Sequence, residues 1–539
     1  MANVKFSRKE FEKQIKLTEE IKEKIALFGT PLESVTDDEI ELEIFPNRPD
    51  LLSLQGFLRG FLSFLGKKKT PTYKINKPEK DYEVKIDKSV KEVRPFTTCC
   101  IVKNLKFNDE KIKEIIDIQE KIHGTLGRNR KKIAIGIYPL EKITLPITYE
   151  ARKPKDIKFI PLEMDQELSG LQILQRHPTG REYAFLLEGK EKFPVFIDAA
   201  GEILSMPPII NSHKTGKIEE STKDVFIECS GFDFEILKKT LNILTTLFSD
   251  LGGSVYQMKL TGINEITPDL TPEKMKIDIE ECNKLLGLEL KEKEFEKLAK
   301  KMGYDYKNKT VEIPAYRTDV LHPVDVYEDI AIAYGYDNFI PALPEISTIG
   351  KEEDVVIKKR KISEILSGLG FQEVLTYHLT TKEDLKRTTL KLETIELEDS
   401  KTDYKILKPN MAVSTLKVLS DNVDARYPQK IFELGVIFEK DESKETGIIE
   451  KEKLSIAVSG ETDFTEIKQV LGYLMKMLGK EFVIEETENK LCIEGRCGKI
   501  IVGDKEIGFL GEIRPSILKN FHLKMPTIIL EIDFERLFN

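Results

Sequence analysis

The chain contains no tryptophan, and its 539 residues include only six cysteines and six histidines. No two cysteines form a Cys-x-x-Cys pair, and no Cys or His spacing is typical of a zinc site. This pattern indicates buried, reduced thiols and a cytoplasmic location. No apolar run approaches the length of a membrane span, and the first residues lack the apolar core of a signal peptide. We therefore expect a cytoplasmic protein without membrane contact.

Charge, in contrast, is abundant. Lys, Arg, Asp and Glu make up 33% of the residues, above the usual quarter or so. Many of them are Lys and Glu, which fits surface ion-pair networks and a heat-loving source. With a formal net charge of −9, the chain as a whole lacks the basic character of a nucleic-acid-binding protein, although local basic patches stay open. The length predicts several domains rather than one core.

Segment 314–336 carries the most specific pattern in the chain. Pro323 suits the first position of a helix, where no backbone N–H is needed. Three acidic residues of such a helix, at i, i+3 and i+4, share one face, and a fourth lies just before it. Four carboxylates could therefore meet at one point. They belong to Asp319, Asp325, Glu328 and Asp329.

Two interpretations of this acidic cluster stay open on spacing alone. Mg²⁺ prefers oxygen ligands, and a cation would relieve the mutual repulsion of four carboxylates. Acidic residues in a first helical turn also interact favourably with the positive end of the helix dipole, with no metal. The spacing by itself favours the second interpretation.

Hydrophobic periodicity and capping residues predict several further elements. We expect one helix over about 9–28 and another over 51–65, with Asp50 as the cap of the second. The Lys- and Pro-rich residues 67–90 are typical of a linker. Short β-type runs follow at 132–138, 183–187, 195–198 and 225–229.

The strand predicted over 225–230 places a carboxylate in an informative position. Side chains alternate between the faces of a strand, so Glu228 shares a face with Phe226 and Ser230. A carboxylate on the wall of a pocket could accept the hydrogen bond of a phenolic hydroxyl, and a ring without that hydroxyl would leave it unpaired. The alternative is that Glu228 is an ordinary exposed strand residue, and spacing alone favours it.

A basic run at 128–132 also has two interpretations. Its arginines and lysines could contact the phosphates of a nucleic acid. A solvated loop that leads into a strand is the more usual arrangement, and we keep it as the expectation.

Several motifs together resemble those of one known family. The patterns R-x-D, V-D-x-x-E-D and A-Y-G-Y within 317–336 are similar to the beta subunit of phenylalanyl-tRNA synthetase. The resemblance covers essentially the whole chain. It includes none of the extra domains of bacterial-type members, so it implies an archaeal-type member. It also implies that four acidic positions are magnesium ligands near the alpha subunit, namely Asp319, Asp325, Glu328 and Asp329.

The family's editing module is resembled by residues 127–136, 196–212 and 226–234. That module hydrolyses tyrosine wrongly attached to the phenylalanine tRNA. On this resemblance we predict that Glu228 senses the tyrosine hydroxyl and that Asn211 lies near the ester. Ser205 and Ser230 are expected to shape the pocket. The sequence offers no nucleophile–base pair, so we expect a water activated by the substrate's own ribose to attack.

The C-terminal region resembles the family's catalytic-like domain, which has the class II synthetase fold but does not activate amino acids. A working class II site needs an arginine on a strand to hold the ATP phosphate, and a G-x-G-x-G-x-x-R motif. No arginine adjoins Phe432-Glu433, and no G-x-G-x-G occurs. The resemblance therefore implies adenylate chemistry on an alpha subunit, in an assembly of two alpha and two beta chains that uses ATP, Mg²⁺ and the phenylalanine tRNA.

Taken together, these features predict an α+β multidomain protein, and the resemblance implies the beta subunit of a phenylalanine–tRNA ligase that hydrolyses mis-attached tyrosine. Its alternatives are a non-enzymatic RNA-binding or scaffold protein and a free-standing aminoacyl-tRNA deacylase. The expected parts are an N-terminal α/β module with a linker over 1–85, a mixed α/β editing domain over 91–265, a small α/β domain with the acidic magnesium-site helix over 269–345, and a class II catalytic-like antiparallel-sheet domain without catalytic motifs over 352–539.

Overall fold

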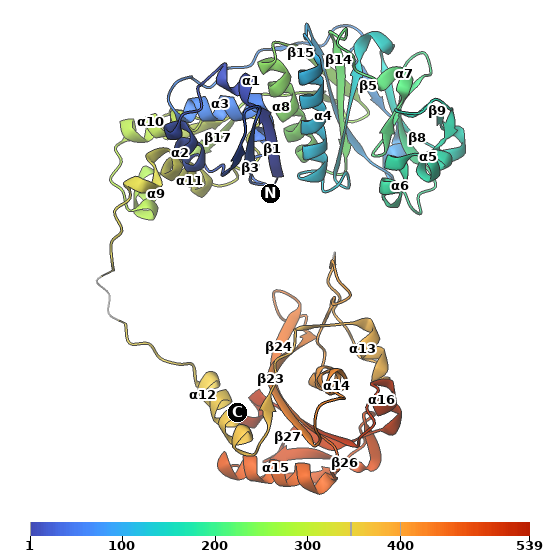
Figure 1. Ribbon diagram of the computed structural model, residues 1–539, viewed down its shortest axis with the longest axis vertical. Helices are drawn as coiled ribbons and strands as arrows, with labels where there is room; N and C mark the ends of the chain where they lie inside the picture. The colour runs from blue at the N-terminus through green and yellow to red at the C-terminus, as the bar shows by residue number, and fades with distance from the viewer. Residues whose placement is uncertain (1, 345–347, 399, 539) are drawn as a thin grey trace. The chain divides into compact units, whose positions relative to one another are not determined.

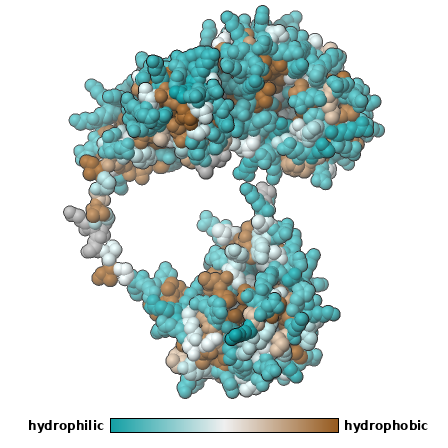
Figure 2. All heavy atoms as spheres, in the orientation of Figure 1, coloured by the Kyte–Doolittle hydropathy of each residue, from teal (hydrophilic) through white to brown (hydrophobic). Residues whose placement is uncertain are grey.

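The computed structural model describes residues 2–344, 348–398 and 400–538. It divides into two compact units, Met1–Leu343 and Pro344–Asn539, called unit 1 and unit 2 below (Figure 1). The visible face of each unit is mainly hydrophilic, with apolar patches between the polar side chains (Figure 2). Among the described residues, no helix is both long and apolar enough to cross a bilayer.

Unit 1 begins with a small sheet in the strand order β1-β3-β2. Its strands and the first helices are β1 (Ala2–Ser7), β2 (Leu32–Val35), β3 (Glu39–Ile44), α1 (Arg8–Glu12) and α2 (Glu19–Leu27). The single helix expected over 9–28 is therefore wrong, since the chain is interrupted between α1 and α2. The side chain of Thr18 accepts a hydrogen bond from the Ile21 N–H (3.3 Å) and so begins a new helix.

Helix α3 (Leu54–Phe64) is capped by a different residue from the one expected. Ser53, not Asp50, accepts the hydrogen bond from the Gly56 N–H, at 3.0 Å. Asp50 instead lies buried in the short turn before the helix, where both its oxygens accept bonds from Arg48, each at 2.9 Å. A buried carboxylate paired with arginine is fully occupied, so the next polar residue caps the helix.

A large sheet forms the centre of unit 1. Helices α4 (Asp109–Gly124) and α8 (Phe234–Asp250) pack against one face at the end that includes its edge strand β7 (Figure 1). The sheet's main path, in order, is β13 (Ile210–Asn211), β12 (Ile203–Met206), β11 (Phe193–Ile197), β8 (Ile147–Arg152), β5 (Glu83–Ile86), β15 (Ser254–Thr261), β6 (Phe96–Lys103), β14 (Val225–Gly231) and β7 (Ile133–Pro139).

Two sequence predictions for this region are wrong. Part of the linker expected over 67–90 joins the sheet, because β4 (Ile75–Asn76) and β5 pair in parallel with β15. Parallel partners lie far away along the chain, so local composition does not reveal them. The strand expected over 183–187 is helical, within α6 (Pro178–Tyr183) and a 3₁₀ turn (Ala184–Leu186), and Pro178 occupies the first position of α6.

The last part of unit 1 combines a small sheet with three helices. The helix predicted to open at Pro323 is confirmed as α11 (Pro323–Tyr334). The other elements are β17 (Glu273–Lys276), β18 (Asp305–Lys307), β19 (Thr310–Ile313), α9 (Ile279–Leu286) and α10 (Glu292–Lys301).

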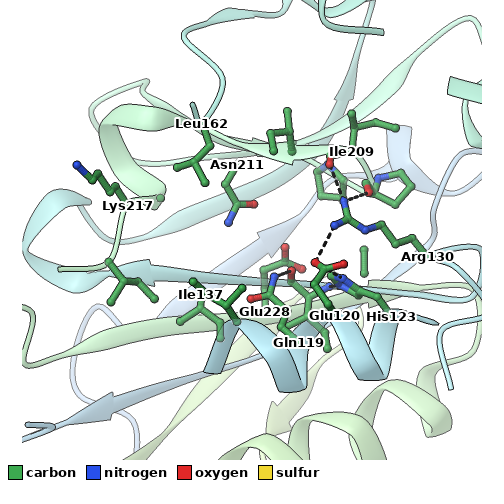
Figure 3. Close-up of a pocket in the computed structure, with 18 of the residues that line it drawn as sticks. Gln119, Glu120, His123, Arg130, Ile137, Leu162, Ile209, Asn211, Lys217 and Glu228 are labelled. Atoms are coloured by element: carbon green, nitrogen blue, oxygen red, sulfur yellow. Dashed lines mark hydrogen bonds and ion pairs between the residues drawn. The ribbon is translucent and has the colours of Figure 1, made fainter. Parts of the chain in front are cut away.

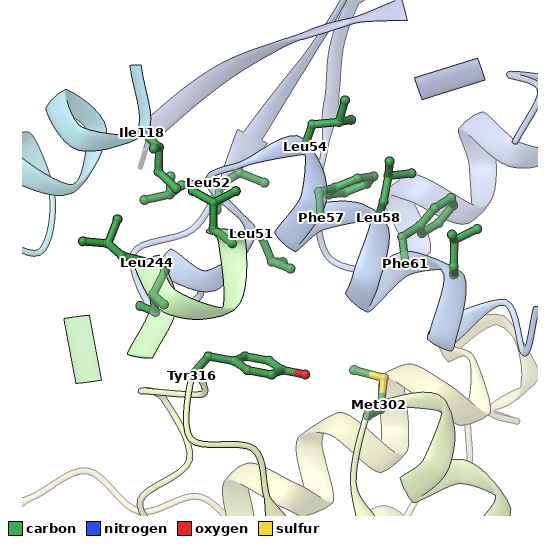
Figure 4. Packing of buried hydrophobic residues seen from close by; sticks show 14 of the residues in the cluster. Leu51, Leu52, Leu54, Phe57, Leu58, Phe61, Ile118, Leu244, Met302 and Tyr316 are labelled. Carbon is green, nitrogen blue, oxygen red and sulfur yellow. The ribbon is translucent and has the colours of Figure 1, made fainter. Parts of the chain in front are cut away.

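One apolar cluster ties the three parts of unit 1 together. Phe57 and Phe61 of α3 lie in the same buried cluster as Leu244 of α8 and Met302 and Tyr316 of the last part (Figure 4). Because these side chains are close-packed across the three parts, the parts form one body that holds the sheet and its edge in place.

Unit 2 is built on a seven-stranded sheet with apolar clusters on both faces. Its antiparallel pairing agrees with the expected sheet type, apart from β20 (Gln372–Glu373), which lies parallel to β23 (Gln429–Lys440). The strands continue from β23 as β24 (Ile448–Ser459), β28 (Thr527–Asp533), β27 (Lys505–Ile513), β26 (Cys492–Val502) and β25 (Val483–Glu486), and the longest helices are α12 (Asp354–Gly368), α14 (Met411–Asp421) and α15 (Phe464–Met477).

Candidate functional site

A cavity of about 500 Å³ opens beside the edge strand β7 of unit 1 (Figure 3). Helix α4, strands β7 and β14, and segment 207–218 form its walls. Most of the lining is apolar, from Ile112, Ile116, Ile137, Leu162, Pro207, Pro208, Ile209, Ile210 and Ile218. The polar side chains that line it are Gln119, Glu120, His123, Arg130, Glu163, Asn211, His213, Lys217 and Glu228. An apolar cavity with a few convergent polar groups is the usual form of a small-ligand site.

Glu228 reaches this cavity from a buried position on β14, where its side chain is 1% exposed. The predicted alternation is confirmed, since Phe226 and Ile227 belong to apolar clusters on opposite sides of the sheet. Gly136 lies directly opposite Glu228 on β7. A Cβ at Gly136 would lie 2.5 Å from Glu228 Oε1, so only glycine leaves room for the carboxyl group. The alternative of an exposed Glu228 is excluded.

The carboxyl group of Glu228 is incompletely paired. Its Oε2 atom is buried and has no hydrogen-bond partner among the described residues. Burial raises the pKa of Glu228 to about 8, although Arg94 and the hydroxyls of Tyr138 and Ser230 offset part of the shift. Glu228 is therefore mainly protonated at neutral pH, and one of its oxygens can bond to a ligand.

Tyr138 gathers three polar side chains around its hydroxyl. The hydroxyl lies 2.7 Å from Ser205 Oγ, 3.3 Å from Asn211 Oδ1 and 3.3 Å from Glu228 Oε1. Asn211 and Glu228 line the cavity, whereas Ser205 lies behind Tyr138 and does not. Sequence reasoning missed Tyr138, although its place in the predicted strand, two residues after Gly136 and on the same face, was a usable signal.

Ser230 occupies a different position from the one expected. Its hydroxyl accepts a hydrogen bond from Arg94 Nε (3.2 Å), and its carbonyl accepts one from Arg94 Nη2 (2.7 Å). Both residues are buried, and neither lines the cavity. Ser230 therefore positions Arg94 behind Glu228, and a part for Ser230 in shaping the pocket stays a prediction.

Helix α4 holds the edge strand through two side chains that the sequence did not reveal. Gln119 Nε2 donates to the Ile135 carbonyl, and the Ile135 N–H donates to His123 Nε2, each at 2.8 Å. Burial lowers the pKa of His123, which keeps its ring neutral and Nε2 free to accept. Both backbone groups of Ile135 are thus satisfied at a sheet edge that lies beside a cavity.

Arg130 closes one side of the cavity. Its Nη1 donates to the Ile209 carbonyl (2.8 Å) and its Nη2 to Glu120 Oε1 (2.8 Å), as the dashed lines in Figure 3 mark. The side chain is only 13% exposed and also lies over the ring of Tyr183. The expectation of a purely solvated loop over 128–132 is therefore wrong at Arg130, which joins the end of α4 to the 207–218 wall.

The acidic residues around α11 are organised by an arginine. Arg317 donates to both oxygens of Asp319 (2.8 and 2.7 Å) and to Asp329 (2.6 Å), which also accepts from the Tyr304 hydroxyl. Asp325 accepts from the N–H groups of residues 321 and 322 at the start of the helix. This arrangement supports the helix-dipole interpretation for Asp325 and adds a buried ion pair for the other two.

Glu328 is the exposed member of this acidic set. Partial burial raises its pKa, and the charges of Asp329, Asp325 and Asp319 raise it further. In the described part of the chain, however, no three His, Cys, Asp or Glu side chains are arranged to hold a metal ion. The four carboxylates therefore do not meet at one point, because Arg317 and the helix cap hold three of them in other bonds.

The packing around Gly136 leads to a stability prediction. The variant G136A is expected to lower the free energy of unfolding of unit 1 by about 1–3 kcal/mol, the usual cost of overpacking. Its Cβ would lie 2.2 Å from the Tyr138 hydroxyl oxygen as well as 2.5 Å from Glu228. Urea denaturation measures the change, with G124A as the matched control, because the nearest atom to a Cβ at Gly124 is 3.9 Å away. Equal losses in both variants would contradict the proposed collision.

The burial of Glu228 leads to a prediction about pH. The folded chain holds the Glu228 proton more tightly than the unfolded chain does, with a pKa of about 8 against the ordinary 4.5. The stability that Glu228 contributes is therefore fully present below about pH 4.5 and is lost as the pH rises to about 8. The free energy of unfolding of the wild type should fall over this range relative to E228Q. Parallel pH profiles for the two proteins, obtained from urea denaturation, would show that Glu228 is not titrating in this way.

Comparison with family models matches three parts of the chain. Residues 340–534 match the phenylalanyl tRNA synthetase beta chain CLM domain, residues 275–336 the tRNA synthetase B5 domain and residues 82–250 the B3/4 domain. The cavity-lining residues fall within the third match, and the Arg317 cluster falls within the second.

Relatives are similar over most of their length. The chain is 38% identical to the phenylalanine–tRNA ligase beta subunit of Thermococcus sibiricus, over 90% of this chain and 88% of the relative. It is 35% identical to that of Archaeoglobus fulgidus, over 96% and 95%. A crystal structure of an N-terminal fragment of the phenylalanyl-tRNA synthetase beta subunit from Pyrococcus horikoshii has 34% identity and a TM-score of 0.59, and the match covers 62% of this chain and 99% of the fragment.

Proposed function

Because the chain belongs to the phenylalanyl-tRNA synthetase beta-subunit family, we propose that it acts with an alpha subunit and removes tyrosine wrongly attached to the phenylalanine tRNA. The observation that carries the editing role is the buried, unpartnered Oε2 of Glu228 on the wall of an apolar cavity. A tyrosine hydroxyl would supply the missing partner. Phenylalanine would leave Oε2 unpaired, which costs roughly 1–3 kcal/mol.

The chemistry asked of this site is hydrolysis of an ester. Water adds to the ester carbonyl carbon, and the bond to the ribose oxygen breaks, which releases tyrosine and free tRNA. Among the described residues, the cavity lining includes no serine, threonine or cysteine. This composition supports attack by a water molecule that the neighbouring ribose hydroxyl activates, with Glu228 selecting the substrate and Asn211 lying beside it.

Unit 2 is assigned a supporting role in this proposal. The strand position beside Phe432 carries Glu433, whose Oε1 accepts from Lys408 Nζ at 3.1 Å. Both side chains are essentially buried, at 2% and 0% exposure. A class II site needs an arginine that can bind the ATP phosphate, so this ion pair supports the assignment of adenylate formation to the alpha chain. As part of the same proposal, we assign unit 2 the class II synthetase fold without its catalytic motifs.

Magnesium binding stays a prediction. Asp319 and Asp329 would have to leave Arg317 before they could join Asp325 and Glu328 around an ion, so the arrangement in this chain does not fit the metal. No step proposed here depends on it. Titration with MgCl₂, followed by the melting temperature of the chain with and without an alpha subunit, measures whether a site forms.

Two assays test the proposed function. Co-expression with an archaeal-type alpha chain, followed by mass measurement, should give a complex of two alpha and two beta chains. That complex should hydrolyse the tyrosine ester of the phenylalanine tRNA much faster than the phenylalanine ester of the same tRNA. A complex without deacylation would favour an RNA-binding or scaffold role, whereas deacylation by a monomer that binds no alpha chain would favour a free-standing deacylase.

A further inference from the structure

The hydroxyl of Tyr138 has one proton to donate and three oxygens within reach. Ser205 Oγ is the shortest contact at 2.7 Å, against 3.3 Å for Asn211 Oδ1 and for Glu228 Oε1. The proton therefore goes to Ser205, and the lone pairs of the Tyr138 oxygen remain available to accept. Tyr138 is fully buried, so no bulk water competes for these bonds.

This arrangement makes the two oxygens of Glu228 different. Oε1 lies 3.3 Å from the Tyr138 oxygen, which is free to accept, whereas Oε2 has no hydrogen-bond partner among the described residues. A protonated carboxyl group places its proton where it can be donated, because an unpaired buried donor is costly. The proton therefore lies on Oε1, and Oε2 is left as a bare carbonyl-type acceptor beside the cavity.

We propose that the site selects aromatic aminoacyl groups that carry a hydrogen-bond donor in the para position, with Tyr138 as the positioning residue that leaves Glu228 Oε2 as the acceptor. The inference rests on the proposed editing function and extends it from tyrosine to a chemical class. A para hydroxyl and a para amino group both donate, and a para fluorine, although similar in size, does not. The site thus recognises a hydrogen-bond donor at the para position and not the size of the para substituent.

The substrate series tests this without any change to the protein. The complex with the alpha subunit is given the same tRNA esterified with phenylalanine, tyrosine, 4-aminophenylalanine or 4-fluorophenylalanine at pH 7. Tyrosine and the 4-amino ester should be hydrolysed about 10- to 100-fold faster than phenylalanine, and the 4-fluoro ester at about the phenylalanine rate. A 4-fluoro rate equal to that of tyrosine, or a 4-amino rate equal to that of phenylalanine, would overturn the inference.

The failure of the inference can be told apart from failure of the function itself. If tyrosine is cleared and the 4-fluoro ester is cleared equally fast, editing stands and donor recognition falls. If no ester is hydrolysed above its spontaneous rate, both fall. Each outcome is decided by rates measured on the wild-type complex, so a variant that fails to fold cannot obscure the answer.

The role of Tyr138 is tested with Y138F. The variant should lower the ratio of the 4-amino to the 4-fluoro rate by about tenfold, because either oxygen of Glu228 can then carry the proton.

The matched control is Y149F. Tyr149 is also fully buried, but its hydroxyl donates to the Arg94 carbonyl (2.8 Å) and not to Glu228. Loss of that bond should leave the ratio of 4-amino to 4-fluoro rates within about twofold of the wild type. If Y138F leaves the ratio unchanged, or Y149F lowers the ratio equally, Tyr138 is not the positioning residue.

Discussion

Replacement of Arg317 by methionine is expected to lower the free energy of unfolding of unit 1 by about 3–5 kcal/mol, the usual cost of removing one partner of a buried ion pair. Arg317 is 2% exposed, and the side chains of Asp319 and Asp329 are 10% and 7% exposed. Methionine replaces the apolar stem of the arginine side chain but removes the charged guanidinium group. Two buried carboxylates would then lack their main counter-ion, so the folded state would lose more than the unfolded state.

Urea denaturation followed by circular dichroism measures this loss, and hydrogen exchange over residues 302–334 assigns it to unit 1. The control is R8Q, because Arg8 pairs with Glu12 at a half-exposed i,i+4 position, at 31% and 35% exposure. Such a pair contributes about 0.5 kcal/mol or less. The double variant R317M/D329N should recover part of the loss. A change below about 1 kcal/mol in R317M would contradict the role assigned to this arginine.

The second large effect is expected at Glu228. The variant E228L should reduce clearance of the tyrosine ester by about 10- to 100-fold, to the rate of the phenylalanine ester, because a site that pairs with a substrate hydroxyl loses its selectivity with that partner. Leucine nearly fills the same space without a carboxyl group. The stability of unit 1 should not fall, and it should rise, because the buried unpaired Oε2 is removed.

Opposite signs for activity and stability distinguish a functional group from a structural one. Single-turnover deacylation and urea denaturation provide the two measurements. E163Q is the control, since Glu163 also lines the cavity but is exposed to solvent. Clearance by E228L within a few-fold of the wild type would remove Glu228 from the proposed site, whereas a large loss of stability would show that it serves the fold.

Local signals in the sequence were sufficient for some of these features. Pro323 and the acidic first turn predicted α11, because the residues that start a helix lie within one turn of it. The alternation of side chains along 225–230 correctly placed Glu228 and Ile227 on opposite faces of the strand. The motifs of 317–336 indicated the family, which the relatives confirm.

Other features depended on residues far apart along the chain. Tyr138 lies 67 residues from Ser205 and 90 residues from Glu228, yet the three side chains meet. The sequence contains each of these residues without showing which ones touch. The sequence likewise does not show that β5 joins the sheet by pairing with β15. Nor does it show that Arg94 donates a hydrogen bond to Ser230.

The sequence by itself therefore determined the helix starts, the faces of the strands and the family, since each depends on neighbouring residues or on a continuous motif. Only the tertiary structure decided which oxygen of Glu228 stays unpaired and which cationic side chain forms ion pairs with Asp319 and Asp329. Those outcomes depend on burial, because a carboxyl group that would be solvated and interchangeable at the surface must find a specific partner once water is excluded.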